Sequence, residues 1–226
     1  LADDMGYGDV SALNEKSRIR TPAIDALCRE GVTFTDAHSG SSVSTPSRYG
    51  ILTGRYAFRT TLKSGVTNSY SPPLIAPDRR TIATFLSEQG YSTACIGKWH
   101  LGETGSTPEE HGFDMHIPHG YLKGWPARGY MAPFGMNGFD GEKGEYLTDR
   151  LTDEALRYIE KNRNEPFFLF MSHFAVHDPI QGRADLVEKY RKKLRSMPPS
   201  ELPPFILEGN PDDPDPASAE ELLRCL

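Results

Sequence analysis

The stretch around which the chain is organised is Ser44-Thr45-Pro46-Ser47-Arg48-Tyr49-Gly50-Ile51-Leu52-Thr53-Gly54-Arg55. It predicts a short helix beginning just after Ser44, because Pro46 suits a first helical turn and Gly54 suits the left-handed residue that ends a helix. Ser44 then lies at the positive end of the helix dipole, where free backbone N–H groups favour an anion. Arg48 follows on the same face and can fold back over Ser44. Taken alone, the Ser-x-Pro-x-Arg pattern is typical of an ordinary helix with a surface arginine.

Composition narrows the class of protein. The chain has 226 residues with a globular composition, enough for one domain with a substantial core. Its net charge of -6 argues against nucleic-acid binding, which needs a basic surface. The longest apolar run, 167–171, is too short to insert into a membrane. The cysteines make neither a disulfide framework nor a metal-binding spacing. We expect them to be small buried residues, with a Cys28–Cys95 bridge left open.

Predicted helices and strands alternate along the chain. Helices are predicted at 21–31, from 78 or 81 to 89, and from about 149, with the end of a strand at the N-terminus and further strands at 32–37, 91–96 and 166–172. The helix residues expected to face the core are Ile24, Leu27, Cys28, Ile82, Phe85, Leu86, Leu151, Ala155, Leu156 and Ile159. This order predicts an α/β fold with a mainly parallel sheet sandwiched by helices.

Residues able to do chemistry follow the predicted strands. In open α/β sheets, ligands bind beyond the carboxyl ends of the strands, so we expect these residues to meet at one edge. In chain order, after successive strands, they are Asp3 and Asp4, Ser44, Lys98 and His100, and His177.

The acidic pair and the Lys-x-His pair are weak signals by themselves. Adjacent carboxylates such as Asp3 and Asp4 suit calcium or magnesium, although a solvated acidic turn has the same sequence. Lys98 and His100 share strand parity and can point into one cavity, yet residues of these types beyond a strand usually lie on the surface.

Two motifs together are more specific. Residues 44–55 resemble the signature of the type I sulfatases, C/S-x-P-S-R-x-x-x-L-T-G-R, at each specified position, and 97–102, Gly-Lys-Trp-His-Leu-Gly, resemble the second motif of that family. His177 is similar to its later active-site histidine. The resemblance implies an alkaline-phosphatase-like fold of which residues 1–226 are the N-terminal part, because the family's second pair of calcium ligands and a later lysine have no counterpart. An incomplete fold of this kind is expected to be inactive when isolated.

The resemblance also implies a nucleophile and a metal. In the family the first motif residue is oxidised to formylglycine, which here is Ser44, the residue type found in bacterial members. The conversion implies a radical-type maturation enzyme as a partner. Asp3, Asp4 and the modified Ser44 are implied ligands of a calcium ion.

The remaining site residues receive roles by the same resemblance. Arg48 stabilises the negative charge of the nucleophile, and Lys98 holds the sulfate oxygens. His100 takes a proton from the formylglycine hydrate, and His177 faces the leaving-group oxygen. The implied activity is hydrolysis of sulfate esters, with carbohydrate sulfates as the expected substrates and a periplasmic or exported location.

Other segments complete the interpretation. The glycine- and aromatic-rich loop 102–144 is expected to form the substrate rim, with His111, His116 and His119 as rim or structural residues. Residues 198–218 are expected to form a proline-rich exposed connector, followed by the start of a helix at 220–226. Two alternatives stay open. They are a phosphate or phosphonate ester hydrolase of the same superfamily, and a non-catalytic protein that binds sulfated glycans.

Overall fold

The structure is a computed structural model that describes residues 1–68, 71–103 and 105–198. The chain separates into two compact units, Leu1–Asp178 and Pro179–Leu226, which are described one at a time. The first contains η1 (Tyr7–Asp9), α1 (Pro22–Glu30), α2 (Ser44–Thr53), η2 (Ala57–Arg59), α3 (Ile82–Glu88), β1 (Ser92–Gly97), η3 (Glu109–His111), β2 (Met115–Ile117), α4 (Leu147–Asn162) and β3 (Phe167–Ser172). The described part of the second contains α5 (Ala184–Ser196).

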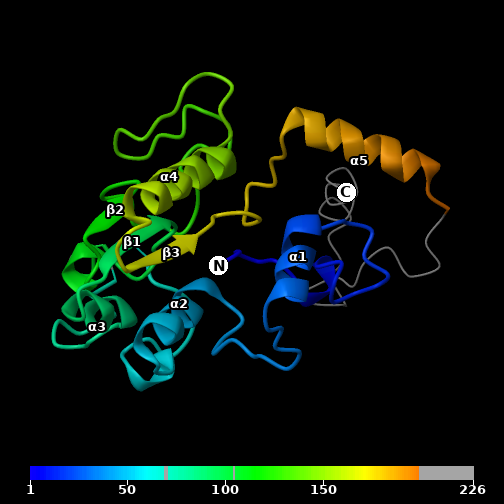
Figure 1. The fold of residues 1–226 in the computed structure, drawn as a ribbon. Helices are drawn as coiled ribbons and strands as arrows, with labels where there is room; N and C mark the ends of the chain where they lie inside the picture. The colour runs from blue at the N-terminus through cyan, green and yellow to red at the C-terminus, as the bar shows by residue number, and fades with distance from the viewer. Residues whose placement is uncertain (69–70, 104, 199–226) are drawn as a thin grey trace. The chain divides into compact units, whose positions relative to one another are not determined.

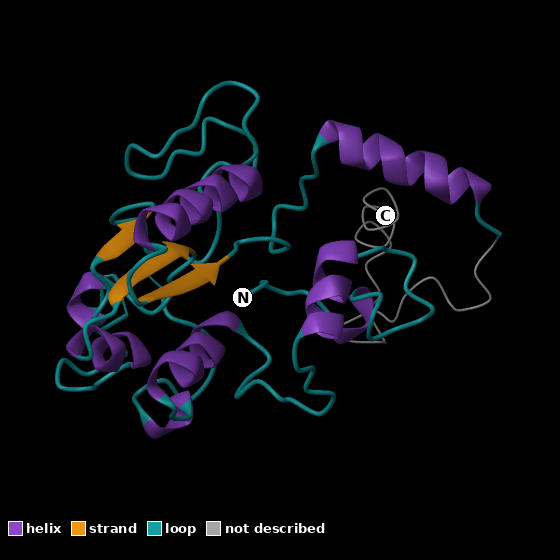
Figure 2. Cartoon of the chain, viewed as in Figure 1, coloured by secondary structure: helices purple, strands orange, loops and turns teal. Residues whose placement is uncertain are grey.

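The three strands form a parallel sheet with the order β2-β1-β3 (Figures 1 and 2). The N-terminal residues extend the pairing beside β3. The amino group of Leu1 donates to the carbonyl of Met171 at 2.7 Å, and the backbone N–H of Asp3 donates to that of Ala175 at 2.9 Å. Asp3 is thereby held next to the carboxyl end of β3, so the expected strand character at the N-terminus is present as backbone pairing.

Helices cover both faces of the sheet. Cys95 packs into a core with residues of α2 and α3, whereas its strand neighbours Ala94 and Ile96 pack into a second core with residues of α4. This alternation follows from the period of two along a strand. The predicted α/β fold, with a parallel sheet sandwiched by helices, is confirmed.

The helix ends follow the expected chemistry in α2 and α3. Gly54 follows α2 with φ of 67°, in the left-handed region. The Thr81 side chain accepts the N–H of Thr84 as the cap of α3. Helix α2 begins one residue earlier than predicted, with Val43 as the cap and Ser44 inside the first turn.

The strand predicted at 32–37 is wrong. Residues 35–36 form a turn and the rest of the segment has no regular structure, and its apolar residues Val32 and Phe34 are 84% and 77% exposed. An alternating pattern predicts a strand only where one face is buried, and no other described strand pairs with this segment. Ser44 therefore does not follow a second strand as we expected.

Several predicted helix faces are also wrong. In α4 the buried residues are Leu147, Leu151, Ala155 and Tyr158, a regular helical stripe, while Leu156 is 58% exposed. Leu156 and Ile159, which we expected to be buried, lie outside this stripe. Other residues expected to face the core but exposed in the described structure are Ile24, Leu27, Ile82, Phe85 and Ile159.

The remaining expectations have mixed outcomes. Strand β2 lies inside the segment taken for a long loop, and α5 was not predicted. Cys28 and Cys95 are both free. Apart from Pro198, the connector 198–218 lies outside the described residues, as does the helix at 220–226.

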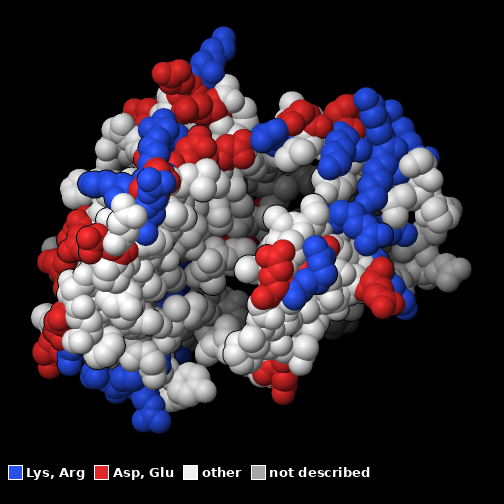
Figure 3. Space-filling view, in the orientation of Figure 1, with Lys and Arg blue, Asp and Glu red and all other residues white. Residues whose placement is uncertain are grey.

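No helix in the described part of the chain is long and apolar enough to cross a membrane. Figure 3 shows Lys and Arg gathered over α5, against the negative net charge of the chain.

Candidate active site

Arg48 is the centre of a buried hydrogen-bond cluster. The side chain is 1% exposed. Its Nε donates to Ser44 Oγ at 2.9 Å, and an Nη2 hydrogen bond of 2.8 Å reaches Asp3 Oδ1. Its Nη1 donates to the carbonyl of Lys98 at 3.0 Å and to the hydroxyl of Ser172. The predicted fold-back of Arg48 over Ser44 is present, and the same guanidinium joins segments far apart in the sequence.

Lys98 forms the second cation of the cluster. Its ammonium group donates to the other carboxylate oxygen of Asp3, and both side chains are nearly free of solvent contact. Burial lowers the pKa of Lys98 and that of Arg48, and the negative charge of Asp3 opposes the shift in both. Two cations share this one carboxylate, so a second negative charge nearby is needed to balance them.

Gly97 allows the backbone at the end of β1 to lie close to the end of β3. Its φ is +107°, and a Cβ placed there would lie 1.9 Å from the carbonyl oxygen of Ser172. That same carbonyl accepts the backbone N–H of Lys98 at 2.7 Å. A residue without a side chain is thus required where β1 passes the end of β3.

Asp4 and His177 lie beside the cluster. One carboxylate oxygen each from Asp3 and Asp4, and one ring nitrogen of His177, lie within 4.8 Å of one another. Asp4 is exposed and has a φ of 56°, and His177 is half-buried. The Tyr130 hydroxyl donates to the His177 carbonyl at 2.8 Å and anchors its backbone. His177 thus lies near the acidic pair, and its implied role toward the leaving-group oxygen stays a prediction.

Ser44 is half-buried at the start of α2. With Asp3, Asp4 and Arg48, it lines a cavity of about 270 Å³ that is open to solvent. The metal donors implied at Asp3, Asp4 and Ser44 therefore share one cavity.

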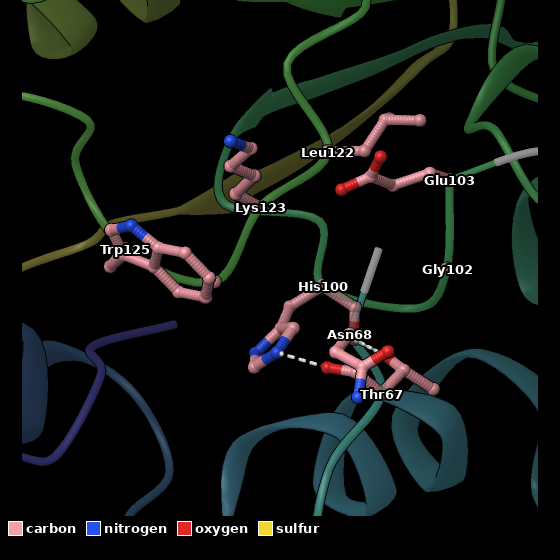
Figure 4. Close-up of a pocket in the computed structure, with 9 residues that line it drawn as sticks. Thr67, Asn68, His100, Gly102, Glu103, Leu122, Lys123 and Trp125 are labelled. Atoms are coloured by element: carbon pink, nitrogen blue, oxygen red, sulfur yellow. Dashed lines mark hydrogen bonds between the residues drawn. The ribbon is translucent and has the colours of Figure 1, made fainter. Parts of the chain in front are cut away.

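His100 is connected to the first turn of α2 through Thr45. The Thr45 hydroxyl donates to the His100 carbonyl at 2.9 Å, and His100 Nε2 is 3.0 Å from the carbonyl oxygen of Thr67 (Figure 4). Since a carbonyl only accepts, Nε2 carries the proton and Nδ1 is a bare acceptor. Burial, followed by the charge of Lys98, lowers the pKa of His100 to about 4.

The structure thus joins four of the predicted residues by direct hydrogen bonds, namely Asp3, Ser44, Arg48 and Lys98. Asp4 and His177 adjoin them, and the His100 carbonyl accepts a hydrogen bond from the side chain of Thr45, the residue after Ser44. Of the loop histidines, His111 and His116 are buried structural residues, and His119 is an exposed partner of Glu109.

Sequence reasoning missed Ser172, whose hydroxyl contacts Arg48 and is fully buried. The available signal was its position as a polar residue ending the apolar run of β3, directly before His173. It also missed Thr45 and Thr67, since the hydrogen bonds of these hydroxyls to His100 depend on a loop that has no sequence pattern.

Fold and site together define an α/β protein with a charged, largely buried cluster of Asp3, Ser44, Arg48 and Lys98 at the carboxyl edge of its parallel sheet. The sulfatase family model matches residues 1–198. Human N-acetylgalactosamine-6-sulfatase is 33% identical over 208 residues, covering 80% of this chain and 39% of that protein. N-acetylgalactosamine-6-O-sulfatase of Bacteroides thetaiotaomicron is 30% identical over 245 residues, covering 79% and 47%. The chain belongs to the sulfatase family.

Solved structures of other proteins have a similar fold. Ps i-CgsB superposes with a TM-score of 0.71 at 30% identity, covering 85% of this chain and 47% of that one. BT4656, in complex with its substrate D-glucosamine-2-N,6-O-disulfate, gives 0.67 at 30% identity, covering 89% and 38%. The chain spans less than half the length of these relatives.

Proposed function

We propose that the whole protein hydrolyses sulfate esters of carbohydrates at the site around Ser44. The observation that carries the proposal is the Arg48 guanidinium, which contacts Ser44 and the carboxylate that also binds Lys98. A nucleophile hydrogen-bonded to one buried cation, with a second cation on the same carboxylate, suits attack on an anionic ester, because donors fixed in a low-dielectric site stabilise negative charge without reorganising.

We propose formylglycine at position 44. A plain serine hydroxyl needs an adjacent base, and no ring nitrogen or carboxylate is hydrogen-bonded to Ser44 Oγ in the described residues. When hydrated, the modified residue supplies two geminal hydroxyls, one to attack sulfur and one to drive the release of sulfate. Arg48 Nε, already 2.9 Å from Ser44 Oγ, would hold the reacting oxygen. A maturation enzyme is the partner that this proposal requires.

A calcium ion fits the acidic pair. Asp3 and Asp4 offer the carboxylate oxygens that a hard cation prefers, and the open cavity leaves room for further ligands. Both carboxylates balance the charges of Arg48 and Lys98, so the cluster alone is neutral and attracts a sulfate ester only weakly. A divalent ion on Asp3 and Asp4 would supply the missing positive charge and polarise oxygens bound there.

The histidines can move protons. His100 is neutral at pH 7, because its pKa is lowered to about 4, and its Nδ1 has no hydrogen-bond donor among the residues that the structure describes. It is therefore suited to accept a proton from residue 44 rather than to donate one. We propose that His177, whose ring lies near Asp3 and Asp4, contacts the sulfate or the oxygen that leaves.

The substrate class rests on the relatives. N-acetylgalactosamine-6-sulfatases and BT4656, with its glucosamine disulfate, act on sulfated sugars by their names. We propose the same broad class for this protein, which is consistent with export of the protein to an extracellular or periplasmic glycan.

The test uses full-length protein co-produced with a serine-type maturation enzyme. Mass spectrometry of the peptide spanning residue 44 is expected to show a loss of two hydrogens relative to serine. Sulfated sugars should then release sulfate faster than matched phosphate esters release phosphate. Unconverted serine in protein from the native organism would overturn the formylglycine mechanism, and faster phosphate release would favour a phosphate ester hydrolase.

A further inference from the structure

Helix α5 carries a concentration of positive charge that the proposed active site does not use. The helix holds five lysines and arginines and two acidic residues, whereas the whole chain has a net charge of -6. Figure 3 shows these cations gathered over α5. The basic residues of the helix are Lys189, Arg191, Lys192, Lys193 and Arg195.

The acidic residues of α5 already have cationic partners, so they leave other cations unbalanced. Asp185 pairs with Arg183 at 2.6 Å, and Glu188 Oε1 lies 3.9 Å from Lys192 Nζ. The exposed cations of α5 that make no ion pair with any residue in the described part of the chain are Lys189, Arg191 and Arg195. The surface of α5 is therefore positive, although the chain is acidic.

Helix stability does not explain this arrangement. Lys193 and Arg195 lie in the last turn, where cations complement the helix dipole, but Lys189 and Arg191 precede that turn. Lys189 and Lys193 are four residues apart, and both ammonium groups lie 5.7 Å from the centre of the Tyr190 ring. Arg191 and Arg195 form a second like-charged pair with the same separation. Because like charges at this separation destabilise a helix, a bound anion would relieve a repulsion that the fold itself leaves in place.

The spread of the cations along α5 favours an extended polyanion. Lys189 and Arg195 are six positions apart, which is roughly 9 Å along a helix axis. A polymer with repeated anionic groups can contact several of these side chains at once. A membrane surface fits less well, since the exposed large apolar residues of α5 are Leu186 and Leu194 alone, at 41% and 37%. The net charge of -6 opposes binding of a nucleic acid.

We propose that α5 binds a sulfated polysaccharide through Lys189, Arg191 and Arg195. This surface acts independently of the site around Ser44, and it rests on the proposed function only in the choice of a sulfated glycan as the polyanion. Guanidinium and ammonium groups form charge-assisted hydrogen bonds with anionic oxygens. Each exposed ion pair is weak, but several of them along one polymer chain add together.

The experiment measures calorimetric binding of chondroitin 6-sulfate to full-length Ser44→Ala protein at about 50 mM and about 200 mM salt. This background neither converts residue 44 nor uses it for hydrolysis, so the result does not depend on the proposed function. Adding Lys189→Gln, Arg191→Gln and Arg195→Gln together is expected to weaken binding by about tenfold or more at the lower salt. The affinity of this triple variant should also fall less steeply with salt, because fewer counterions are released on binding.

The matched control removes the same charge from other elements. It combines Arg29→Gln in α1, Arg59→Gln in η2 and Lys161→Gln in α4, all at exposed residues. We expect its affinity to stay within about threefold of the Ser44→Ala protein. If the triple α5 variant unfolds at a lower temperature than the control, Lys189→Gln with Arg191→Gln replaces it, because this pair leaves the last turn unchanged. Weaker binding by the pair than by the control then supports the proposal, and equal binding rejects it.

Three further results would overturn the proposal. The first is equal affinity of the triple α5 variant and the control, or no binding of chondroitin 6-sulfate at all. The second is equally tight binding of hyaluronan, which carries carboxylates without sulfate. The third is loss of binding in the triple variant to vesicles of phosphatidylserine and phosphatidylcholine but not to the polysaccharide, which would make α5 a membrane-binding surface. Sulfate release by the converted protein tests the proposed function separately.

Discussion

Arg48 donates four hydrogen bonds to groups from different parts of the chain, and Ser172 is one of the two partners of its Nη1. Ser172→Ala leaves one buried charged donor unpaired. We expect a loss of about 1–3 kcal/mol in stability, the usual cost of an unsatisfied buried group. Thermal unfolding of the full-length protein measures it. Ser64→Ala, at an exposed serine, is the control and should stay within about 0.5 kcal/mol. Equal stability of the two variants would show that Ser172 does not support Arg48.

Among the side-chain contacts of Arg48, the sequence spacing predicted the one with Ser44 and could not predict those with Asp3 and Ser172. The four-residue separation of Ser44 and Arg48 on a helix implies the hydrogen bond between them. The contact of Arg48 with Asp3 joins residues 45 positions apart, and that with Ser172 joins residues 124 positions apart. Such contacts are fixed by the order of the strands, which no local pattern specifies.

Two glycines that flank elements of the site offer a matched test of backbone constraint. Gly54, after α2, has φ of +67° with open space around it, so alanine costs only the left-handed strain, about 1–2 kcal/mol. Gly97, at the end of β1, combines φ of +107° with a clash against the Ser172 carbonyl. We expect Gly97→Ala to lower the unfolding midpoint of the full-length protein further than Gly54→Ala does. Similar midpoints would mean that β1 and β3 separate easily at their carboxyl ends.

Strand β2 carries a buried histidine that makes stability depend on pH. Burial lowers the pKa of His116 from 6.5 to about 4 in the folded protein. The unfolded chain therefore binds the proton first, and the stability from neutral His116 is full above about pH 6.5 and is lost as the pH falls toward 4. We expect His116→Leu to reduce this acid loss by up to about 3 kcal/mol, since one pKa unit corresponds to about 1.4 kcal/mol. Urea unfolding at several pH values measures the loss. An unchanged slope in the variant would place the acid sensitivity elsewhere, for example at His100, whose pKa is also lowered to about 4.

The positions of the helices in the sequence were predicted better than the side of each helix that faces the core. Proline and glycine positions indicated α1, α2 and α3 because they act locally on backbone angles. Which apolar residues face the core depends on the neighbouring layer, so Leu156 and Phe85 are exposed although they fit a helical stripe. The three-residue strand β2 is too short to show a period, and its pairing with β1 alone defines it.

For the whole molecule, a divalent ion bound by Asp3 and Asp4 is expected to stabilise the folded state. Adding calcium to metal-free full-length protein should raise its thermal unfolding midpoint, because an ion that binds only the folded state stabilises it. Asp4→Asn removes one carboxylate and should abolish most of the rise, while Asp36→Asn, an exposed acidic control, should leave it unchanged. A rise that is the same in Asp4→Asn as in the wild type would place the ion elsewhere.

The central claim is that residue 44 performs the hydrolysis. Its most direct test is the rate at which full-length protein with converted residue 44 releases inorganic sulfate from its best sulfated sugar, measured beside Ser44→Ala from the same host. The account predicts loss of at least about a thousandfold in kcat for Ser44→Ala, the scale of removing a covalent nucleophile. A rate within about tenfold of the converted protein would contradict it.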